Sequence, residues 1–305
     1  MKSNNTNLTI LLYHGVYNNK PRGITNYSGK HIKIDKFKKQ MMIVKKNYSV
    51  LSMEDVVTIK RNKKKWPERS VVISFDDGFK NNHKYAYKVL DQLQIPAIFY
   101  VCAGMIGGNE MFWVDKIEDC INRSKKKNIS LKLDKNYIFQ INSNFQKIKT
   151  INTIKSYCKK IEIEEKDKII DNLIYESKIS PNSNIDENYK LMNWQELKEI
   201  NNNKLFTIGG HSLYHDIMTS QPLNKTEEDI KLTLNLLKYN LNSTIKHYSY
   251  PEGQKNHYNL NIINLLKKNG VICSPSAIKG TNNTNIDLFN LRRIMPNFMK
   301  TKFPL

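Results

Sequence analysis

The sequence has few cysteines, four among 305 residues, and no two of them form a CxxC pair. So few and such scattered thiols do not make a disulfide framework of the kind that stabilises small secreted domains. We therefore expect free or buried thiols, a reducing compartment and, by default, a cytoplasmic location.

Long apolar runs are also missing, since no stretch approaches the roughly 18 consecutive apolar residues of a membrane-spanning helix. The chain starts with polar residues 1–7 and continues directly into a short apolar stretch at residues 8–13. That stretch is too short for a signal peptide and has no cleavage site. We expect no transmembrane segment and no signal peptide, while contact with a membrane surface stays open.

Acidic residues are scarce relative to basic ones, 28 against 49, which gives a formal net charge of +21. Such a charge is typical of proteins that bind nucleic acids or anionic membranes. The excess is mostly lysine, it is spread along the chain, and abundant asparagine and isoleucine accompany it. This pattern favours a general compositional drift, and no nucleic-acid-binding motif is present. We expect no nucleic-acid partner, although a basic surface would suit a membrane-borne, phosphate-linked glycan.

The first stretch that indicates chemistry is residues 71–78, in which a short apolar strand ends in two carboxylates and a glycine. Asp76 and Asp77 would repel each other unless a cation or a shared proton separates their roles. A metal bound by one carboxylate, with the other acting as a base, meets that condition. An Asp-Asp-Gly turn that joins a strand to a helix explains the same residues equally well.

A second stretch, residues 206–215, repeats this layout of a short apolar strand, glycines and then ligand-type side chains. His211 and His215 are four residues apart, so one helical turn or a tight loop would direct both imidazoles to one point. Two histidines and one carboxylate make three protein ligands, the number that a catalytic zinc site uses while one position stays open for water. The two stretches together favour a metal site over isolated structural histidines.

At these residues the sequence resembles the polysaccharide deacetylases with a NodB-type domain, carbohydrate esterase family 4. The family's T-F-D-D-G motif corresponds to residues 74–78, and its H-[ST]-x-x-H motif to residues 211–215. The resemblance implies a divalent metal, with zinc as the first choice, held by Asp77, His211 and His215. It also implies that Asp76 is the catalytic base and that the substrate is a carbohydrate with N-acetyl groups.

The resemblance also implies the fold, an α/β distorted (β/α) barrel formed by a single catalytic domain over residues 1–305. The alternation of apolar strands with amphipathic helices agrees with it, because this order predicts parallel strands joined by helical crossovers. The alternation stops at about residues 117–188, where lysine and asparagine are abundant. We expect a mainly helical insertion there, with helices at about 117–124 and 147–176 and a hairpin at about 131–141.

The turn at Tyr250 and Pro251 is similar to the family's third motif in its Y-P-x-G form. In that motif the backbone N–H of Tyr250 is the candidate donor to the oxyanion, although a simple X-Pro turn is the alternative. An arginine often supports the base in this motif, but Ser249 stands nearby instead. Arg292 or Arg293, near the end of the last predicted strand, could supply that charge, and Arg293 is our candidate.

The family's late Leu-x-His motif, which provides the general acid, has no match, because no histidine follows His257. The leaving amine still needs a proton, so we expect another acid. His14 is the first candidate because it ends the first predicted strand on the same face. Next come His83 and Glu252, which stands where the family usually has an aromatic residue. The remaining histidines, expected to be structural or on the surface, are His31, His247 and His257.

These residues favour a metal-dependent hydrolase that removes an N-acetyl group from an amino sugar of a glycan or glycan precursor, as in cell-surface polysaccharide or lipopolysaccharide biosynthesis. The alternatives are another amidohydrolase on the same barrel, acting on a cyclic imide, an N-formyl group or an O-acetyl ester. A non-catalytic sugar- or nucleic-acid-binding relative is a further alternative, suggested by the charge and the missing acid. The intact metal-ligand set together with Asp76 argues against pure binding.

Overall fold

The computed structural model describes residues 7–298. Residues 1–6, which include most of the polar start considered for a signal peptide, and residues 299–305 lie outside the described part. The elements follow one another in this order: β1 (Thr9–Tyr13), β2 (Gly15–Tyr17), β3 (His31–Lys33), α1 (Ile34–Asn47), β4 (Ser49–Val50), α2 (Met53–Arg61), β5 (Ser70–Phe75), the π-helix η1 (Asn82–Tyr87), α3 (Lys88–Gln92), β6 (Ala97–Val101), the 3₁₀-helix η2 (Ala103–Met105), α4 (Trp113–Arg123), β7 (Asn128–Lys132), β8 (Asn136–Gln140), α5 (Asn144–Cys158), α6 (Ile163–Ser177), α7 (Trp194–Asn202), β9 (Phe206–Gly210), α8 (Leu223–Leu241), α9 (Leu260–Lys268), β10 (Pro275–Lys279), β11 (Leu291–Arg293) and η3 (Pro296–Phe298).

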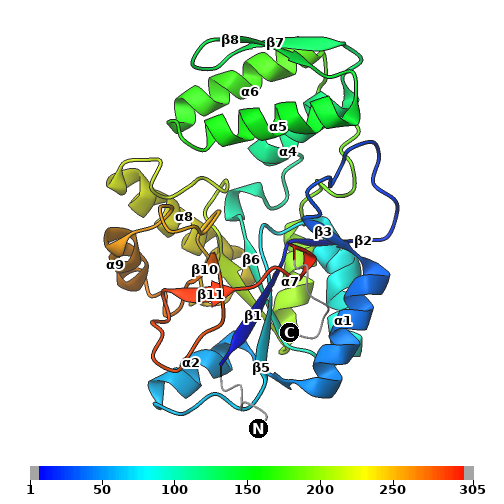
Figure 1. The fold of residues 1–305 in the computed structure, drawn as a ribbon. Helices are drawn as coiled ribbons and strands as arrows, with labels where there is room; N and C mark the ends of the chain where they lie inside the picture. Colours follow the sequence, from blue (N-terminus) through cyan, green and yellow to red (C-terminus); the bar gives the residue numbers. More distant parts are fainter. Residues whose placement is uncertain (1–6, 299–305) are drawn as a thin grey trace.

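A parallel sheet forms the centre of the fold, with its strands in the order β1-β5-β6-β9 and with β4 paired to β5 (Figure 1). Strands β5 and β6 are buried along their whole length, which is why their sequences are nearly continuous apolar runs. Aromatic rings stack across neighbouring strands: the ring centroids of Phe75 and Phe99 are 5.0 Å apart, and those of Tyr13 and Phe75 are 5.4 Å apart. This packing holds the carboxyl ends of β1, β5 and β6 side by side.

The predicted α/β class is confirmed. Within residues 7–298, however, the strands do not form the continuous ladder that would close a barrel. Beyond β9 the pairing continues as isolated parallel bridges and as the two-stranded parallel pair β10–β11. These bridges join Gly210 with Tyr248, His247 with Cys273, and Leu11 with Ile294. Pro251 follows the segment of His247 and Tyr248 and has no N–H to donate, whereas the segment of Cys273 leads directly into β10, which pairs in parallel with β11. Closure of the barrel stays a prediction.

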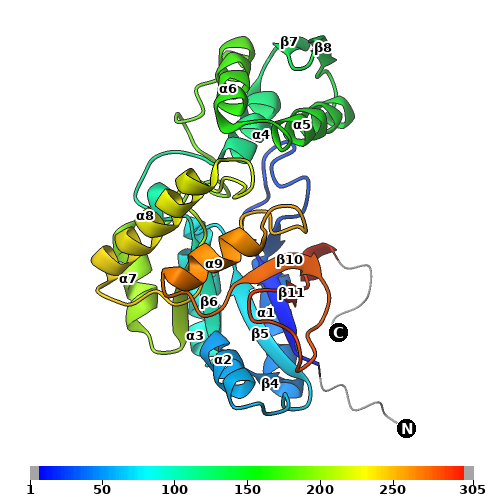
Figure 2. The same cartoon turned by 90° about the vertical axis from the view of Figure 1, so that its left-hand side faces the viewer.

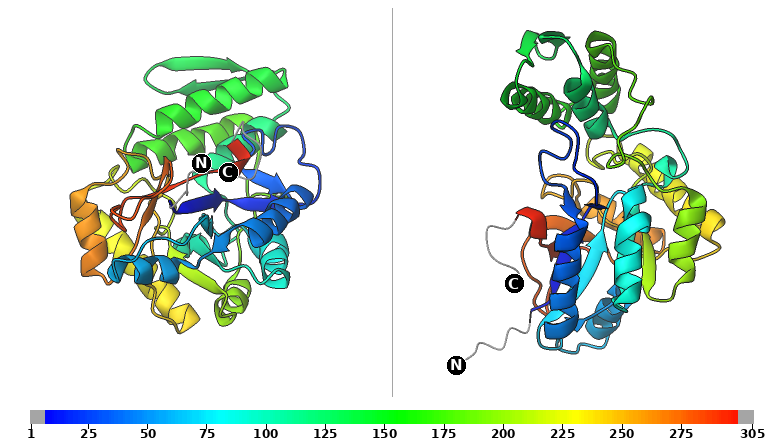
Figure 3. Two further views of the ribbon diagram at one scale, coloured as in Figure 1. Left: turned by 60° about the horizontal axis from the view of Figure 1, so that its bottom comes forward. Right: turned by 90° about the vertical axis from the view of Figure 1, so that its right-hand side faces the viewer.

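Helices surround the central strands, as Figure 3 (left) shows with the lower end of the molecule turned toward the viewer. Local chemistry sets where several of them begin. The side chain of Ser52 caps α2 by accepting from the N–H of Asp55, whose carboxylate accepts from the N–H of Ser52. Asn193 and Glu196 form the same reciprocal capping box at the start of α7, the helix that precedes β9.

Gly209, in β9, lies so close to its neighbours that a side chain has no room there. A Cβ atom at this position would lie 2.5 Å from Cδ1 of Tyr100 and 3.0 Å from the carbonyl oxygen of His247. We therefore expect Gly209→Ala to lower the free energy of unfolding by about 1–3 kcal/mol, as overpacking of a core does. Gly108→Ala is the matched control, because its nearest contact would be 3.4 Å, to the carbonyl oxygen of Met105. Equal midpoints of urea denaturation for the two variants would contradict this prediction.

The region predicted as an insertion forms a lobe made of α4, α5, α6 and the β7–β8 hairpin (Figure 1). The single helix predicted at 147–176 is wrong, because α5 and α6 are separate helices with a turn at 159–162. The turn lets both helices bury apolar side chains in one cluster with α4, which a single straight helix could not do. Representative members of this cluster are Ile117, Ile121, Ile151, Ile154, Ile169 and Leu173. The lobe begins at Trp113, earlier than predicted.

The lobe lies over the carboxyl ends of the central strands, as the two views in Figures 1 and 2 show. Two ion pairs tie it to the loops at those strand ends. Nζ of Lys159, at the end of α5, is 2.7 Å from Oε2 of Glu252, and Nζ of Lys166 is 2.6 Å from Oδ1 of Asp216. The insertion therefore covers the edge of the sheet where α/β proteins place their chemistry.

The cysteines behave as predicted from their spacing. All four, Cys102, Cys120, Cys158 and Cys273, are free and buried. Burial raises the pKa of each thiol, which keeps these groups protonated and unreactive. Separately, within residues 7–298 no helix combines the length and the apolar character needed to cross a membrane.

Candidate active site

Asp76 and Asp77 follow the end of β5, where a sharp turn separates their side chains. Asp77 has a φ of +79° and Gly78 a φ of +91°, so two successive residues are in a backbone region that L side chains rarely adopt. Such strain persists only where the surrounding structure holds it, and it is common at functional sites. The turn directs Asp77 toward two histidines and Asp76 toward an arginine.

His211 and His215 lie in a loop directly after β9, and not on a helical turn. Positive φ angles at Ser212 (+63°) and His215 (+65°) tighten the loop, and the Ser212 hydroxyl accepts from the N–H of His215. Nδ1 of His211 lies 2.8 Å from the carbonyl oxygen of Ser249. Because a carbonyl only accepts, Nδ1 is the protonated nitrogen and Nε2 presents its lone pair to the site.

The three predicted metal ligands converge on one point. Oδ1 of Asp77 is 3.5 Å from Nε2 of His211 and 3.4 Å from Nε2 of His215, and the three candidate ligand atoms lie within 4.8 Å of one another. All three residues are at most about a tenth exposed, and Oδ1 of Asp77 has no hydrogen-bond donor among the described residues. A buried carboxylate oxygen facing two imidazole nitrogens calls for a positive charge, which either a bound cation or a protonated imidazole supplies. The donor set of two nitrogens and one oxygen fits a divalent metal such as zinc.

We expect His215→Ala to weaken zinc binding by more than about 100-fold, because loss of an outer-shell partner alone costs about 10–100-fold. Zinc affinity is measured by competition with a chelator of known affinity, so the readout does not depend on activity. His83→Ala is the matched control, since His83 pairs with Glu199 and does not line the site cavity. Unchanged zinc affinity in His215→Ala would show that this cluster is not the metal site.

Asp76 does not face the candidate metal ligands alone, because Arg293 holds it in a two-point ion pair. Nη1 of Arg293 donates to Oδ1 of Asp76 and Nη2 to Oδ2, both at 2.7 Å. Nη2 also donates to the Ser249 hydroxyl, which in turn donates to Oδ2 of Asp76 at 3.3 Å. Burial alone would raise the pKa of Asp76, but the Arg293 guanidinium, together with His211 and His14, outweighs it and holds the pKa below its usual range.

Of the two candidate arginines, only Arg293 points into the site. Arg293 is almost completely buried, whereas Arg292 is exposed. Successive side chains of a strand point to opposite faces, so the two neighbours on β11 cannot both face inward. Nε of Arg293 donates to the carbonyl oxygen of Ser276 at 2.6 Å, which fixes the guanidinium in its place.

A cavity of about 270 Å³ opens on the site. Two of the three candidate acids line this cavity and one does not. His14 lines the cavity with Asp76 and Asp77, is partly exposed, and has its pKa lowered chiefly by burial. Glu252 also lines it but is paired with Lys159. His83 lies outside the cavity. The three remaining histidines also lie outside the cavity: His31 bonds to Asn81, His247 bonds to Glu54, and His257 accepts from the N–H of Gln254.

The turn at Tyr250 and Pro251, which corresponds to the third motif, contributes a backbone N–H and packing contacts near the site. The side chain of Tyr250 is buried, its hydroxyl donates to the carbonyl oxygen of Phe289, and its ring stacks on Tyr258 with centroids 3.9 Å apart. Its backbone N–H has no acceptor within residues 7–298 and is free to donate. Glu252 has a φ of +57° and turns toward the lobe.

Two lysines of the cavity wall were not found from the sequence. Lys30 lines the cavity, with its Nζ 3.0 Å from Oδ1 of Asp115 and 4.5 Å from the ring centroid of Phe79. Lys159 reaches the cavity from the lobe. Neither belongs to a motif, and both stand in lysine-rich surroundings where composition gives no signal.

The comparisons agree with this geometry. The family model "Polysaccharide deacetylase" matches residues 63–150 and 172–272, more than half of the chain. The chain therefore belongs to the polysaccharide deacetylase family. No curated protein sequence matches it significantly.

Three solved structures with a similar fold match nearly the whole chain. IcaB from Ammonifex degensii has a TM-score of 0.60 at 15% identity, over 95% of this chain and 93% of that one. A de-N-acetylase from Aggregatibacter actinomycetemcomitans has a TM-score of 0.60 at 14% identity, over 97% of both chains. The Streptococcus pyogenes deacetylase PplD, in complex with acetate, has a TM-score of 0.59 at 15% identity, over 95% and 93%. At these identities the likeness establishes the fold alone.

Proposed function

We propose that the protein is a metal-dependent hydrolase that removes an N-acetyl group from an amino sugar of a glycan or glycan precursor. The observation that carries the proposal is that two adjacent carboxylates have different partners. Asp77 faces His211 and His215, while Asp76 is held apart by Arg293. One carboxylate is thus placed to bind a cation and the other to move a proton.

The residues of this chain account for the steps of amide hydrolysis. A zinc ion held by Asp77, His211 and His215 would lower the pKa of a water and polarise the acetyl carbonyl. Asp76 accepts the proton of the attacking water, and Arg293 keeps Asp76 ionised and oriented for it. The backbone N–H of Tyr250 donates to the oxyanion as the carbonyl carbon becomes tetrahedral.

His14 is our candidate for the residue that protonates the leaving amine. It must be in its imidazolium form to do so, a form that burial disfavours and the neighbouring Asp76 and Asp77 carboxylates favour. It stands on the wall of the same cavity as Asp76, and no ion pair within the described residues occupies its side chain. Glu252 is less suitable because Lys159 holds it as an ionised carboxylate, with a pKa that burial raises but Lys159 lowers below its usual range. His83 is excluded by its place outside the cavity.

Several features support an acetylated carbohydrate over the other amides and esters. The family is that of polysaccharide deacetylases, and the structural relatives include a de-N-acetylase and a deacetylase in complex with acetate. A cytoplasmic site of action and a closed barrel belong to this proposal as predictions.

The products of hydrolysis test the proposal against its alternatives. Zinc-loaded protein is incubated with N-acetylhexosamine oligosaccharides, their N-formyl analogues and O-acetylated sugars. We expect acetate and a free primary amine in equal amounts from the N-acetyl substrates. Formate from the N-formyl analogues, or acetate without amine from the O-acetyl sugars, would favour another hydrolase. Absence of all three products would favour a binding protein.

A further inference from the structure

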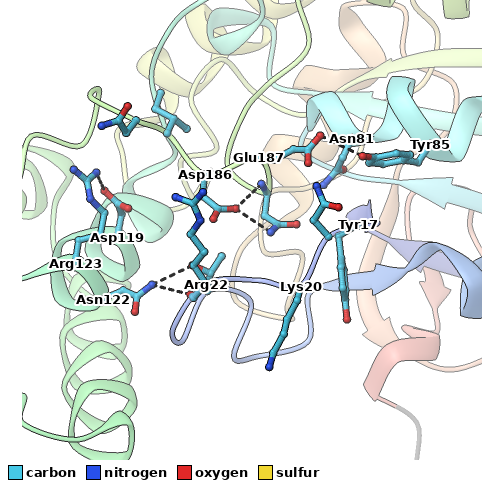
Figure 4. A pocket seen from close by; sticks show the side chains of 15 residues that line it. Tyr17, Lys20, Arg22, Asn81, Tyr85, Asp119, Asn122, Arg123, Asp186 and Glu187 are labelled. Carbon is cyan, nitrogen blue, oxygen red and sulfur yellow. Dashed lines mark hydrogen bonds and ion pairs between the residues drawn. The ribbon is translucent and has the colours of Figure 1, made fainter.

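A second cavity, of about 410 Å³, lies where the lobe joins the sheet, and it shares no residue with the catalytic cavity (Figure 4). Four segments enclose it: the end of β2 with the strap of residues 18–30 that follows it, residues 81–85 around the start of η1, the end of α4, and residues 184–188, which return from the lobe. It exceeds the catalytic cavity in volume. A space of this size takes a ligand of several rings.

The side chains of this cavity are polar and balanced in charge. Asparagines contribute a third of the lining residues, and three basic side chains are matched by three carboxylates. A net-neutral wall has no preference for an anion or a cation. Amides, carboxylates and guanidinium groups placed together offer the paired donors and acceptors that neighbouring sugar hydroxyls require. Tyr17 and Tyr85 add aromatic surface on which a sugar ring can pack.

The cavity is held in shape by hydrogen bonds, and two of its three basic side chains, Lys20 and Arg22, have no hydrogen-bond or ion-pair partner within residues 7–298. Asn122 of α4 accepts from the N–H of Ile24 and donates to the carbonyl oxygen of Arg22 and to the Thr25 hydroxyl, each at 3.1 Å. These bonds fix the strap, while Arg22 is an exposed residue whose guanidinium is left for solvent or a ligand. Figure 4 shows the Arg22 side chain in the cavity beside Asp186.

The strap also connects the two cavities. Thr25 lines the second cavity, while Ser28 and Lys30 line the catalytic one. Residues 25 and 28 are separated by three Cα–Cα steps, so they lie at most about 11 Å apart. A short oligosaccharide can span that wall.

We propose that the second cavity is a distal subsite that binds sugar units of the same glycan whose N-acetyl group lies in the catalytic cavity. This inference depends on the proposed function, and it assigns to Arg22 a positioning role remote from the reacting atoms. The substrate that fits is a chain of several sugars, because a single sugar in the catalytic cavity would leave the distal subsite empty.

The test compares an N-acetylglucosamine hexasaccharide with the disaccharide, in wild type and in Arg22→Gln. Removal of one charge-assisted hydrogen bond should lower the hexasaccharide-to-disaccharide ratio of kcat/KM roughly tenfold, through KM. Arg61→Gln is the matched control, since Arg61 is an exposed arginine on α2, outside both cavities. A ratio unchanged in Arg22→Gln would overturn the inference.

Direct binding separates this inference from the proposed function. Calorimetry with the hexasaccharide is done on zinc-loaded Asp76→Asn, with and without Arg22→Gln. Roughly tenfold weaker binding on adding Arg22→Gln supports the distal subsite even if no substrate releases acetate. Equal affinity of the two proteins refutes it, whatever the activity of the wild type.

Discussion

Asp76→Asn is expected to lower kcat/KM for acetate release by about 10²–10⁴-fold, the contribution that a positioned general base makes. An amide has almost the shape of the carboxylate but cannot accept the proton of the attacking water. Because Asp77, His211 and His215 are unchanged, the variant should still bind zinc. Acetate release and zinc affinity are therefore measured on the same preparation.

Loss of the charge at Asp76 also deprives the buried Arg293 of its partner, so the variant must be shown to be folded at the assay temperature. Asp91→Asn is a suitable control, since this carboxylate accepts from Asn203 outside the site. Activity within threefold of wild type in a folded Asp76→Asn protein would remove Asp76 from the mechanism.

Arg293→Met is expected to lower the free energy of unfolding by about 3–5 kcal/mol, because it leaves a buried carboxylate without its cation. Asp76 loses both donors of the two-point ion pair, and Ser249 loses the contact from Nη2. Methionine has a similar length and adds no polar group, so the change isolates the charge. Urea denaturation monitored by circular dichroism gives the free energy.

Two further variants separate the ion pair from general damage at the end of β11. Arg292→Met, at the exposed neighbour, should alter stability by no more than about 0.5 kcal/mol. The double variant Asp76→Asn/Arg293→Met should regain part of the lost stability, because it removes the unpaired charge. If Arg292→Met and Arg293→Met destabilise equally, or if the double variant is the sum of the two singles, Arg293 does not act through Asp76.

The residues of the site could be found from sequence because their chemistry is local. Asp76 and Asp77 end one apolar strand, and His211 and His215 follow another, so parallel pairing brings the four side chains to one edge. The structure shows how these side chains are oriented: the backbone at Asp77 and His215 is left-handed, which turns each side chain inward. The choice between Arg292 and Arg293 depended on the strand face, which the sequence near residue 293 did not define.

Contacts between distant segments were beyond sequence reasoning. Lys159 reaches the catalytic cavity only because α5 ends at a turn over Glu252, 93 residues further along the chain. The predicted long helix at 147–176 hid that turn, since lysine-rich residues 159 and 160 carry no helix-breaking signal. The second cavity depends on four segments, of which the end of α4 and residues 184–188 meet the other two only when the lobe docks. Because asparagine is abundant along the whole chain, the asparagines of this cavity could not be singled out from the sequence.

Zinc titration of metal-free protein, with bound zinc and released acetate measured together, tests the central proposal most directly. For the wild type we predict acetate release from an N-acetylhexosamine oligosaccharide that rises with bound zinc and stops at one zinc per chain. Asp76→Asn should bind one zinc without releasing acetate, and Asp77→Asn should bind little zinc and release little acetate. Acetate release by metal-free wild type, or full zinc binding by Asp77→Asn, would contradict the proposed site.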